Sequence, residues 1–178
     1  MQKNFKTIEL RINYKFILDR VEEQSTMIWR TTLDKEGNHL PEAVILNEEY
    51  QALFKSLFET VKADLIQIYS PYARQTLSRP YLVTGTIGSF GYNDDDDTSI
   101  SDMLVTMYLP QNFAQENALG IDTYSKNYMV EQILSNWFLD KEVNIASIYN
   151  DKSKVSKTNL IRCLESNITY LKRPYHFF

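Results

Sequence analysis

The sequence predicts an α+β protein that is mainly helical, with about four helices packed against one long antiparallel β-hairpin. Two stretches with strand-like alternation, 81–90 and 99–109, flank a polar turn at 92–97. Other stretches repeat apolar residues every three or four positions, which is helical spacing. The chain has only 5 Gly and 5 Pro in 178 residues, which argues against a loop-rich all-β protein.

The chain begins with a short extended lead-in at 5–10, and a helix is expected over about 10–29. The apolar positions of this helix have helical spacing and are Leu10, Tyr14, Ile17, Val21 and Ile28. Phe16 and Leu18 fall off this stripe, which suggests that the helix is covered on more than one side. A loop follows at 34–41, with Gly37 and Asn38 as its turn.

The next helix has the most continuous apolar stripe. Asn47 is the expected N-cap, and the charges of Glu48 and Glu49 suit the first turn. The stripe consists of Tyr50, Leu53, Phe54, Leu57, Val61, Leu65, Ile68 and Tyr72. Pro71 should kink or end this helix, because proline lacks a backbone donor.

In the hairpin, each strand is expected to present one apolar face. The two apolar sets are Tyr81, Val83 and Ile87 in the first strand, and Met103, Val105, Met107 and Leu109 in the second. One side of the hairpin should therefore pack on helices while the other is wetter. A two-stranded hairpin is marginal alone, so it must lean on helices or on another chain.

Two further helices complete the chain. The stretch of about 118–140 is apolar on two faces, which is typical of a central helix. The last stretch, about 141–172, has an almost wholly polar middle at 150–159. It is one long helix with a solvated middle or two helices broken near Ser153, and we favour the single helix. Pro174 ends it.

The chain is predicted to be one α+β domain over 1–174, followed by an aromatic C-terminal tail at 175–178. The tail residues are Tyr175, His176, Phe177 and Phe178. Aromatic side chains gain free energy by leaving water. We therefore expect the tail to fold back on its own core or to insert into another subunit.

Charge and composition exclude several classes of protein. The net charge is −4, and the run of Asp94, Asp95, Asp96 and Asp97 accounts for all of it. The remaining charges balance, whereas a protein that grips duplex phosphate carries a basic excess, so nucleic acid is not the expected partner. No apolar run suits a signal peptide or a membrane span. The single cysteine, Cys163, cannot form an intramolecular disulfide, which fits a reducing compartment.

The aspartate run is the main candidate for site chemistry. We favour a solvated turn whose charge blunts aggregation at the hairpin tip; contact with a basic partner and a Ca²⁺ or Mg²⁺ site are the alternatives. The run lacks the glycine and the distal glutamate of an EF-hand. We therefore predict no metal and no cofactor.

No catalytic residues are predicted either. The histidines are His39 and His176, and neither has metal-ligand spacing with Cys163. The glycine-containing segment 85–91 is neither a P-loop nor a dinucleotide fingerprint. Cys163 is expected to be a buried, inert thiol. The last helix has a basic bias, but Lys152, Lys154 and Lys157 do not share a stripe, so a solvated face is favoured over nucleic-acid contact.

Three short motifs resemble a known group of proteins. These are the Tyr108-Leu109-Pro110 strand end with Asn112-Phe113, the helix closing on Asn136-Trp137-Phe138, and the final Tyr170-Leu171-Lys172-Arg173-Pro174. They are similar to uncharacterised neck and tail-region proteins of phages and prophages from gut Bacteroides-type bacteria. The resemblance covers about 80–174 and implies a virion structural or head–tail assembly role in ring-like oligomers, located in the bacterial cytoplasm or the virion.

These observations predict a non-enzymatic structural or assembly protein that acts through protein–protein contacts. Open hairpin edges could pair with a neighbour by strand addition. The aspartate run and the aromatic tail are the expected contact sites, and a homo-oligomer is the expected assembled state. The alternative is an accessory binding module for a basic protein or a nucleic acid.

Overall fold

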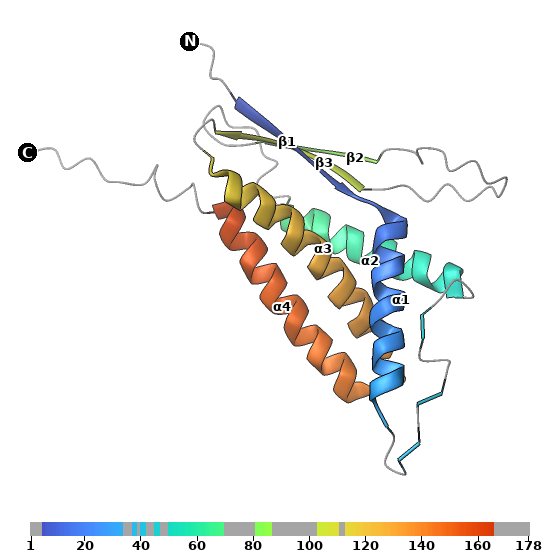
Figure 1. Ribbon diagram of the computed structural model, residues 1–178. Helices are drawn as coiled ribbons and strands as arrows, with labels where there is room; N and C mark the ends of the chain where they lie inside the picture. The colour runs from blue at the N-terminus through green and yellow to red at the C-terminus, as the bar shows by residue number, and fades with distance from the viewer. Residues whose placement is uncertain are drawn as a thin grey trace, which may run out of the picture.

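The computed structural model describes residues 5–33, 37–38, 40–41, 45–46, 50–69, 81–86, 103–110 and 113–165. Its elements, in chain order, are β1 (Phe5–Ile12), α1 (Tyr14–Thr31), α2 (Gln51–Tyr69), β2 (Tyr81–Thr86), β3 (Met103–Pro110), α3 (Gln115–Phe138) and α4 (Val143–Glu165). The prediction of a mainly helical protein with about four helices is confirmed for the described residues, which form four helices. The four helices lie on one side of the strands (Figure 1).

The described strands form a three-stranded antiparallel sheet in the order β1-β3-β2. β2 and β3 pair as expected, but the residues that connect them lie outside the described part of the chain. The expectation of two open edges is wrong for β3. Its outer side pairs along its whole length with β1, from Phe5 opposite Pro110 to Ile12 opposite Met103.

The register also corrects the predicted faces of the hairpin. Val83 lies opposite Thr106, and Thr84 lies opposite Val105. Directly opposed residues share a face of the sheet, so positions 83 and 105 fall on different faces. The helix-facing side is identified by buried Leu10, Ile12, Met103 and Val105. The predicted apolar positions of β2 and β3 therefore lie on different faces of the sheet, because strand register, and not composition, decides which positions share a face.

Helix α1 begins later than predicted. Leu10 shares the helical spacing of Tyr14 and Ile17 but belongs to β1, because pairing with β3 outweighs the local periodicity. Asn13 forms the N-cap, where its side-chain oxygen accepts the Phe16 N–H at 2.9 Å. At the other end, the Thr32 N–H donates to the Ile28 carbonyl.

Helix α1 also anchors the described parts of the connection to α2. The Trp29 indole N–H donates to the Leu40 carbonyl at 2.8 Å. The Leu46 N–H donates to the hydroxyl of fully buried Ser25 at 3.1 Å. The predicted N-cap of α2, Asn47, lies outside the described residues. Helix α2 extends to Tyr69, and Pro71, where it was expected to kink or end, lies outside the described residues.

The core between α1, α2 and α3 is aromatic with one buried polar contact. The Tyr14 ring meets both Phe54 and Phe58 edge-on, with centroids 5.0 Å apart in each case. Burial, with the charge of Glu59 as the second cause, raises the pKa of the Tyr14 hydroxyl to about 12. The Tyr69 hydroxyl hydrogen-bonds the Ser125 hydroxyl of α3, and both side chains are fully buried.

Helix α3 is central, as its two apolar faces predict, since it contacts α1, α2, α4 and β1. Helices α3 and α4 form an antiparallel pair joined by a short turn at 139–142. The prediction of one continuous last helix is confirmed through Glu165. Its middle is not wholly solvated, however, because Ser153 and Ser156 are buried. They continue a stripe facing α3 that comprises Ala146, Tyr149, Ser153, Ser156, Leu160 and Leu164.

A candidate binding groove on helix α3

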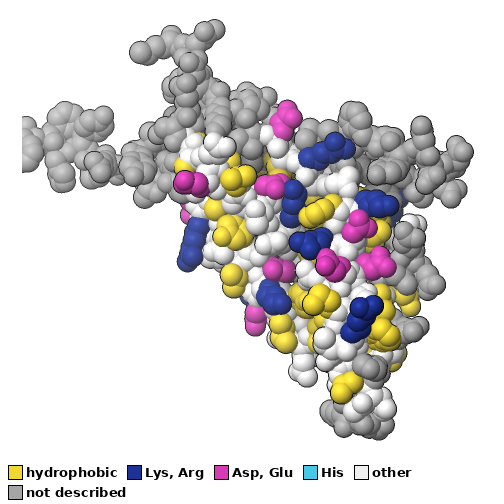
Figure 2. Space-filling model, in the orientation of Figure 1, with side chains coloured by type: hydrophobic (Ala, Val, Ile, Leu, Met, Phe, Trp, Pro, Cys, Tyr) yellow, Lys and Arg dark blue, Asp and Glu magenta, His cyan; other side chains and the backbone are white. Residues whose placement is uncertain are grey.

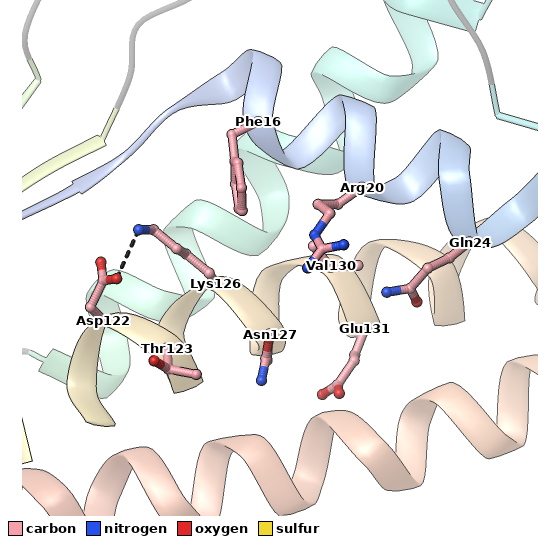
Figure 3. A pocket seen from close by; sticks show the side chains of 9 residues that line it. All are labelled: Phe16, Arg20, Gln24, Asp122, Thr123, Lys126, Asn127, Val130 and Glu131. Carbon is pink, nitrogen blue, oxygen red and sulfur yellow. Dashed lines mark hydrogen bonds and ion pairs between the residues drawn. The ribbon is translucent and has the colours of Figure 1, made fainter. Parts of the chain in front are cut away.

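A groove of about 290 Å³ runs along the surface of α3 beside α1 (Figure 3). Figure 3 shows α3 as its floor, α1 as one wall and α4 on the opposite side. We call it the α3 groove, and its lining consists of Phe16, Arg20 and Gln24 of α1 with Asp122, Thr123, Lys126, Asn127, Val130 and Glu131 of α3. Most of these side chains are polar, so the groove offers hydrogen bonds and charge.

The wall from α1 follows from helical spacing. Phe16, Arg20 and Gln24 are four residues apart, so they lie one above another on the same face of the helix. The Phe16 side chain is 43% exposed and lies between two cations. The Arg20 guanidinium carbon is 5.9 Å and the Lys126 ammonium is 5.6 Å from its ring centroid. Such contacts are favourable by roughly 0.5–1 kcal/mol at exposed sites, which helps keep this ring at the surface.

Both cations of the groove already have anionic partners. The Lys126 ammonium lies 2.8 Å from a carboxylate oxygen of Asp122, one turn earlier in α3. The Arg20 guanidinium lies 3.0 Å from a carboxylate oxygen of Glu23. The groove is therefore not a concentrated positive site. The same face of the molecule shows positive and negative side chains interspersed (Figure 2).

Glu131 is the half-buried charge of the groove. One of its oxygens accepts the Ser156 hydroxyl of α4 at 2.7 Å. Burial raises the pKa of the Glu131 carboxyl above its ordinary value, although the Ser156 hydrogen bond and the positive charge of Lys152 act in the opposite direction. No cation lies within ion-pair distance of Glu131 among the described residues.

Three further side chains that line the groove are polar and have no side-chain hydrogen bond to a described residue. Gln24, Thr123 and Asn127 form no side-chain hydrogen bond with any residue that the structure describes. Gln and Asn each offer an acceptor oxygen and a two-proton donor. These groups are therefore available to a ligand that presents both donors and acceptors, such as a peptide main chain.

The site residues predicted from the sequence are not among the residues that the structure describes. Asp94, Asp95, Asp96 and Asp97 fall outside the described residues, and so do Tyr175, His176, Phe177 and Phe178. The groove itself was not predicted. The sequence contained one indication of it. Phe16 lies outside the apolar stripe of its helix, and Arg20 and Gln24 follow it at intervals of four residues on the same face.

The remaining residues considered from the sequence lie on α4. Cys163 is half-buried against Gly120 of α3, and burial raises the pKa of its thiol. Lys152, Lys154 and Lys157 are exposed, as expected for a solvated face. Lys154 pairs with Asp151 at 3.0 Å, and the Lys152 ammonium lies 4.7 Å from the Tyr149 ring centroid.

Comparison of the chain with protein-family models, curated proteins and solved structures found no match. Within the described ranges, no helix is both long enough and apolar enough to cross a membrane. The same residues contain no group of three or more His, Cys, Asp or Glu side chains placed to hold a metal ion.

Proposed function

We propose that this chain is a non-enzymatic structural or assembly protein that acts through protein–protein contacts. The observation that carries the proposal is the edge of the sheet at β2. Strand β2 pairs with β3 on one side, and no described strand pairs with its other side. An unpaired strand edge is a template for a strand of another chain.

The sequence motifs at 108–113, 136–138 and 170–174 support a more specific role. Their resemblance to phage and prophage neck-region proteins favours a head–tail or tail-completion component, working in the host cytoplasm or in the virion. Identical subunits in such an assembly form closed rings through head-to-tail contacts, and closure limits further growth. The aspartate run at 94–97 and the tail at 175–178 remain the proposed contact segments.

Light scattering tests this proposal. The full chain is compared with a chain that ends at Pro174, each over a range of concentrations. We expect the full chain to form a defined oligomer and the shortened chain to lose it. Strictly monomeric behaviour of both chains, also in the presence of phage neck proteins, would contradict the proposal.

The alternative is an accessory module that binds a basic protein or a nucleic acid. Glu131 in the α3 groove favours the basic protein, since a carboxylate repels phosphate. A gel shift whose strength falls steeply with salt would instead indicate nucleic acid, because phosphate binding releases counterions.

A further inference from the structure

We propose that the α3 groove binds a lysine or arginine side chain carried by an extended segment of a partner protein. Glu131 accepts the cationic group. Gln24 and Asn127 hydrogen-bond the main chain beside it. This inference rests on the proposed function, because the partner is a protein subunit, but it concerns a site on α1 and α3 and not the sheet edge at β2.

The first step of the argument is the charge of Glu131. One carboxylate oxygen accepts the Ser156 hydroxyl, and the other oxygen has no partner among the described residues. A carboxylate can accept about four hydrogen bonds. Half-burial without a matching cation is unfavourable to its charge, and a guanidinium or ammonium from a ligand supplies that cation.

The second step is the sign of the groove. An anionic ligand would compete with Asp122 for Lys126 and with Glu23 for Arg20, which are already paired at 2.8 and 3.0 Å. A cationic ligand at Glu131 displaces no ion pair of the described residues. The groove therefore favours a cation, although two of its own lining residues are basic.

The third step is the size and the lining. About 290 Å³ lies at the lower end of the usual range of ligand pockets. It suits one long side chain with its adjoining main chain. Gln24 projects from the α1 wall and Asn127 from α3, the floor of the groove (Figure 3), and each can both donate and accept a hydrogen bond.

Nuclear magnetic resonance of the full chain tests this inference with the peptide acetyl-Gly-Arg-Gly-amide. We expect the peptide to shift the side-chain amide resonances of Gln24 and Asn127, with a dissociation constant on the order of 1 mM. Glu131→Gln keeps the shape and the Ser156 hydrogen bond but removes the charge. It should weaken binding by about tenfold.

Glu116→Gln is the matched control, because it removes the same charge from the exposed first turn of α3. It should leave binding unchanged. Three results would overturn the inference. The acidic peptide acetyl-Gly-Glu-Gly-amide binds as tightly as the arginine peptide, the Glu131→Gln variant binds the arginine peptide as tightly as the unchanged chain, or no groove resonance moves. If peptide binding fails while the full chain still forms its oligomer, the groove assignment is wrong and the assembly role stands.

The converse outcome is that the peptide shifts the groove resonances in a chain that stays monomeric at every concentration. That result upholds cation recognition and removes the assembly role. Circular dichroism of each variant confirms that the helices are retained.

Discussion

The two flanks of α3 are built in opposite ways. Toward α4 the contact includes several small residues that allow a close approach: the Ser135 hydroxyl donates to the backbone carbonyl of Ala146 at 3.1 Å, and a Cβ atom added to Gly120 would lie 2.7 Å from the Cys163 sulfur. Toward α1 the side chains at the surface are long, with Phe16 and Arg20 facing the groove. The first flank is closed, and the second leaves room for a ligand.

This difference indicates that side-chain size, more than polarity, decides which flank of α3 packs closely against its neighbouring helix. Interhelical distance depends on the residues at the contact. Ser153 is polar yet 1% exposed, because its small side chain fits against α3 and its hydroxyl donates to Gln132 Oε1 at 2.9 Å. Phe16 is apolar yet exposed, because a large ring with flanking cations cannot enter the contact.

Enlarging a small residue on the closed flank should have the largest effect. Ser153→Leu adds volume to a filled contact and leaves Gln132 without this donor. We expect a loss of about 3 kcal/mol in the free energy of unfolding, measured by urea denaturation. Ser147→Leu makes the same change on the exposed side of α4 and should alter stability by less than about 0.5 kcal/mol. Equal effects of the two substitutions would show that the flank is not closely packed.

A double-mutant cycle measures the closest approach on the same flank. Gly120→Ala places a methyl group against the Cys163 sulfur, although alanine favours a helix over glycine by about 1 kcal/mol. In the Cys163→Ala background this clash is relieved. We expect a coupling free energy of about 1.5 kcal/mol from urea denaturation of the four proteins. Additive effects would mean that the sulfur moves aside without cost.

The open flank should tolerate truncation. Phe16→Ala removes a ring that is only partly buried together with its two cation contacts. The expected loss is roughly 1 kcal/mol in the free energy of unfolding. Met27→Ala, at a more exposed position of the same helix, should cost less. A loss above about 3 kcal/mol for Phe16→Ala would place the ring in the core and contradict the open flank.

The smallest effect concerns the pH dependence at Glu131. Because burial raises the pKa of this carboxyl in the folded chain, the folded state holds the proton more tightly than the unfolded state. Its contribution to stability is therefore present below the ordinary glutamate pKa and is lost as pH rises through the raised value. Glu131→Gln should remove this part of the pH dependence, measured by urea denaturation at several pH values. An unchanged pH profile would contradict the expectation.

Much of the helical framework could be predicted, because its determinants are local. The apolar periodicity of α2 and α3 depends on spacing within each segment. The continuity of α4 was also predicted, although the burial of its polar middle was not. Serines at the positions of a core stripe look like a solvated face until the neighbouring helix is known.

Strand pairing and the groove were harder to predict from the sequence. Leu10 fits the spacing of the following helix, but the strand of β1 ends only at Ile12, because it pairs with a segment about a hundred residues away. The faces of β2 and β3 depended on a register that the residue pattern did not fix. The α3 groove joins Arg20 to Asn127 and Glu131, and nothing in either segment indicates the other.

For the described part of the chain, the sequence alone determined the number of helices, the central place of α3 and the continuity of α4, because helical hydrogen bonds and side-chain periodicity act over a few residues. Only the tertiary structure decided that β1 covers one edge of β3, that buried serines of α4 face α3, and that Glu131, hydrogen-bonded to Ser156 of α4, lies half-buried in the groove. The physical reason is that burial and pairing depend on residues that are far apart in the chain and meet only when it folds.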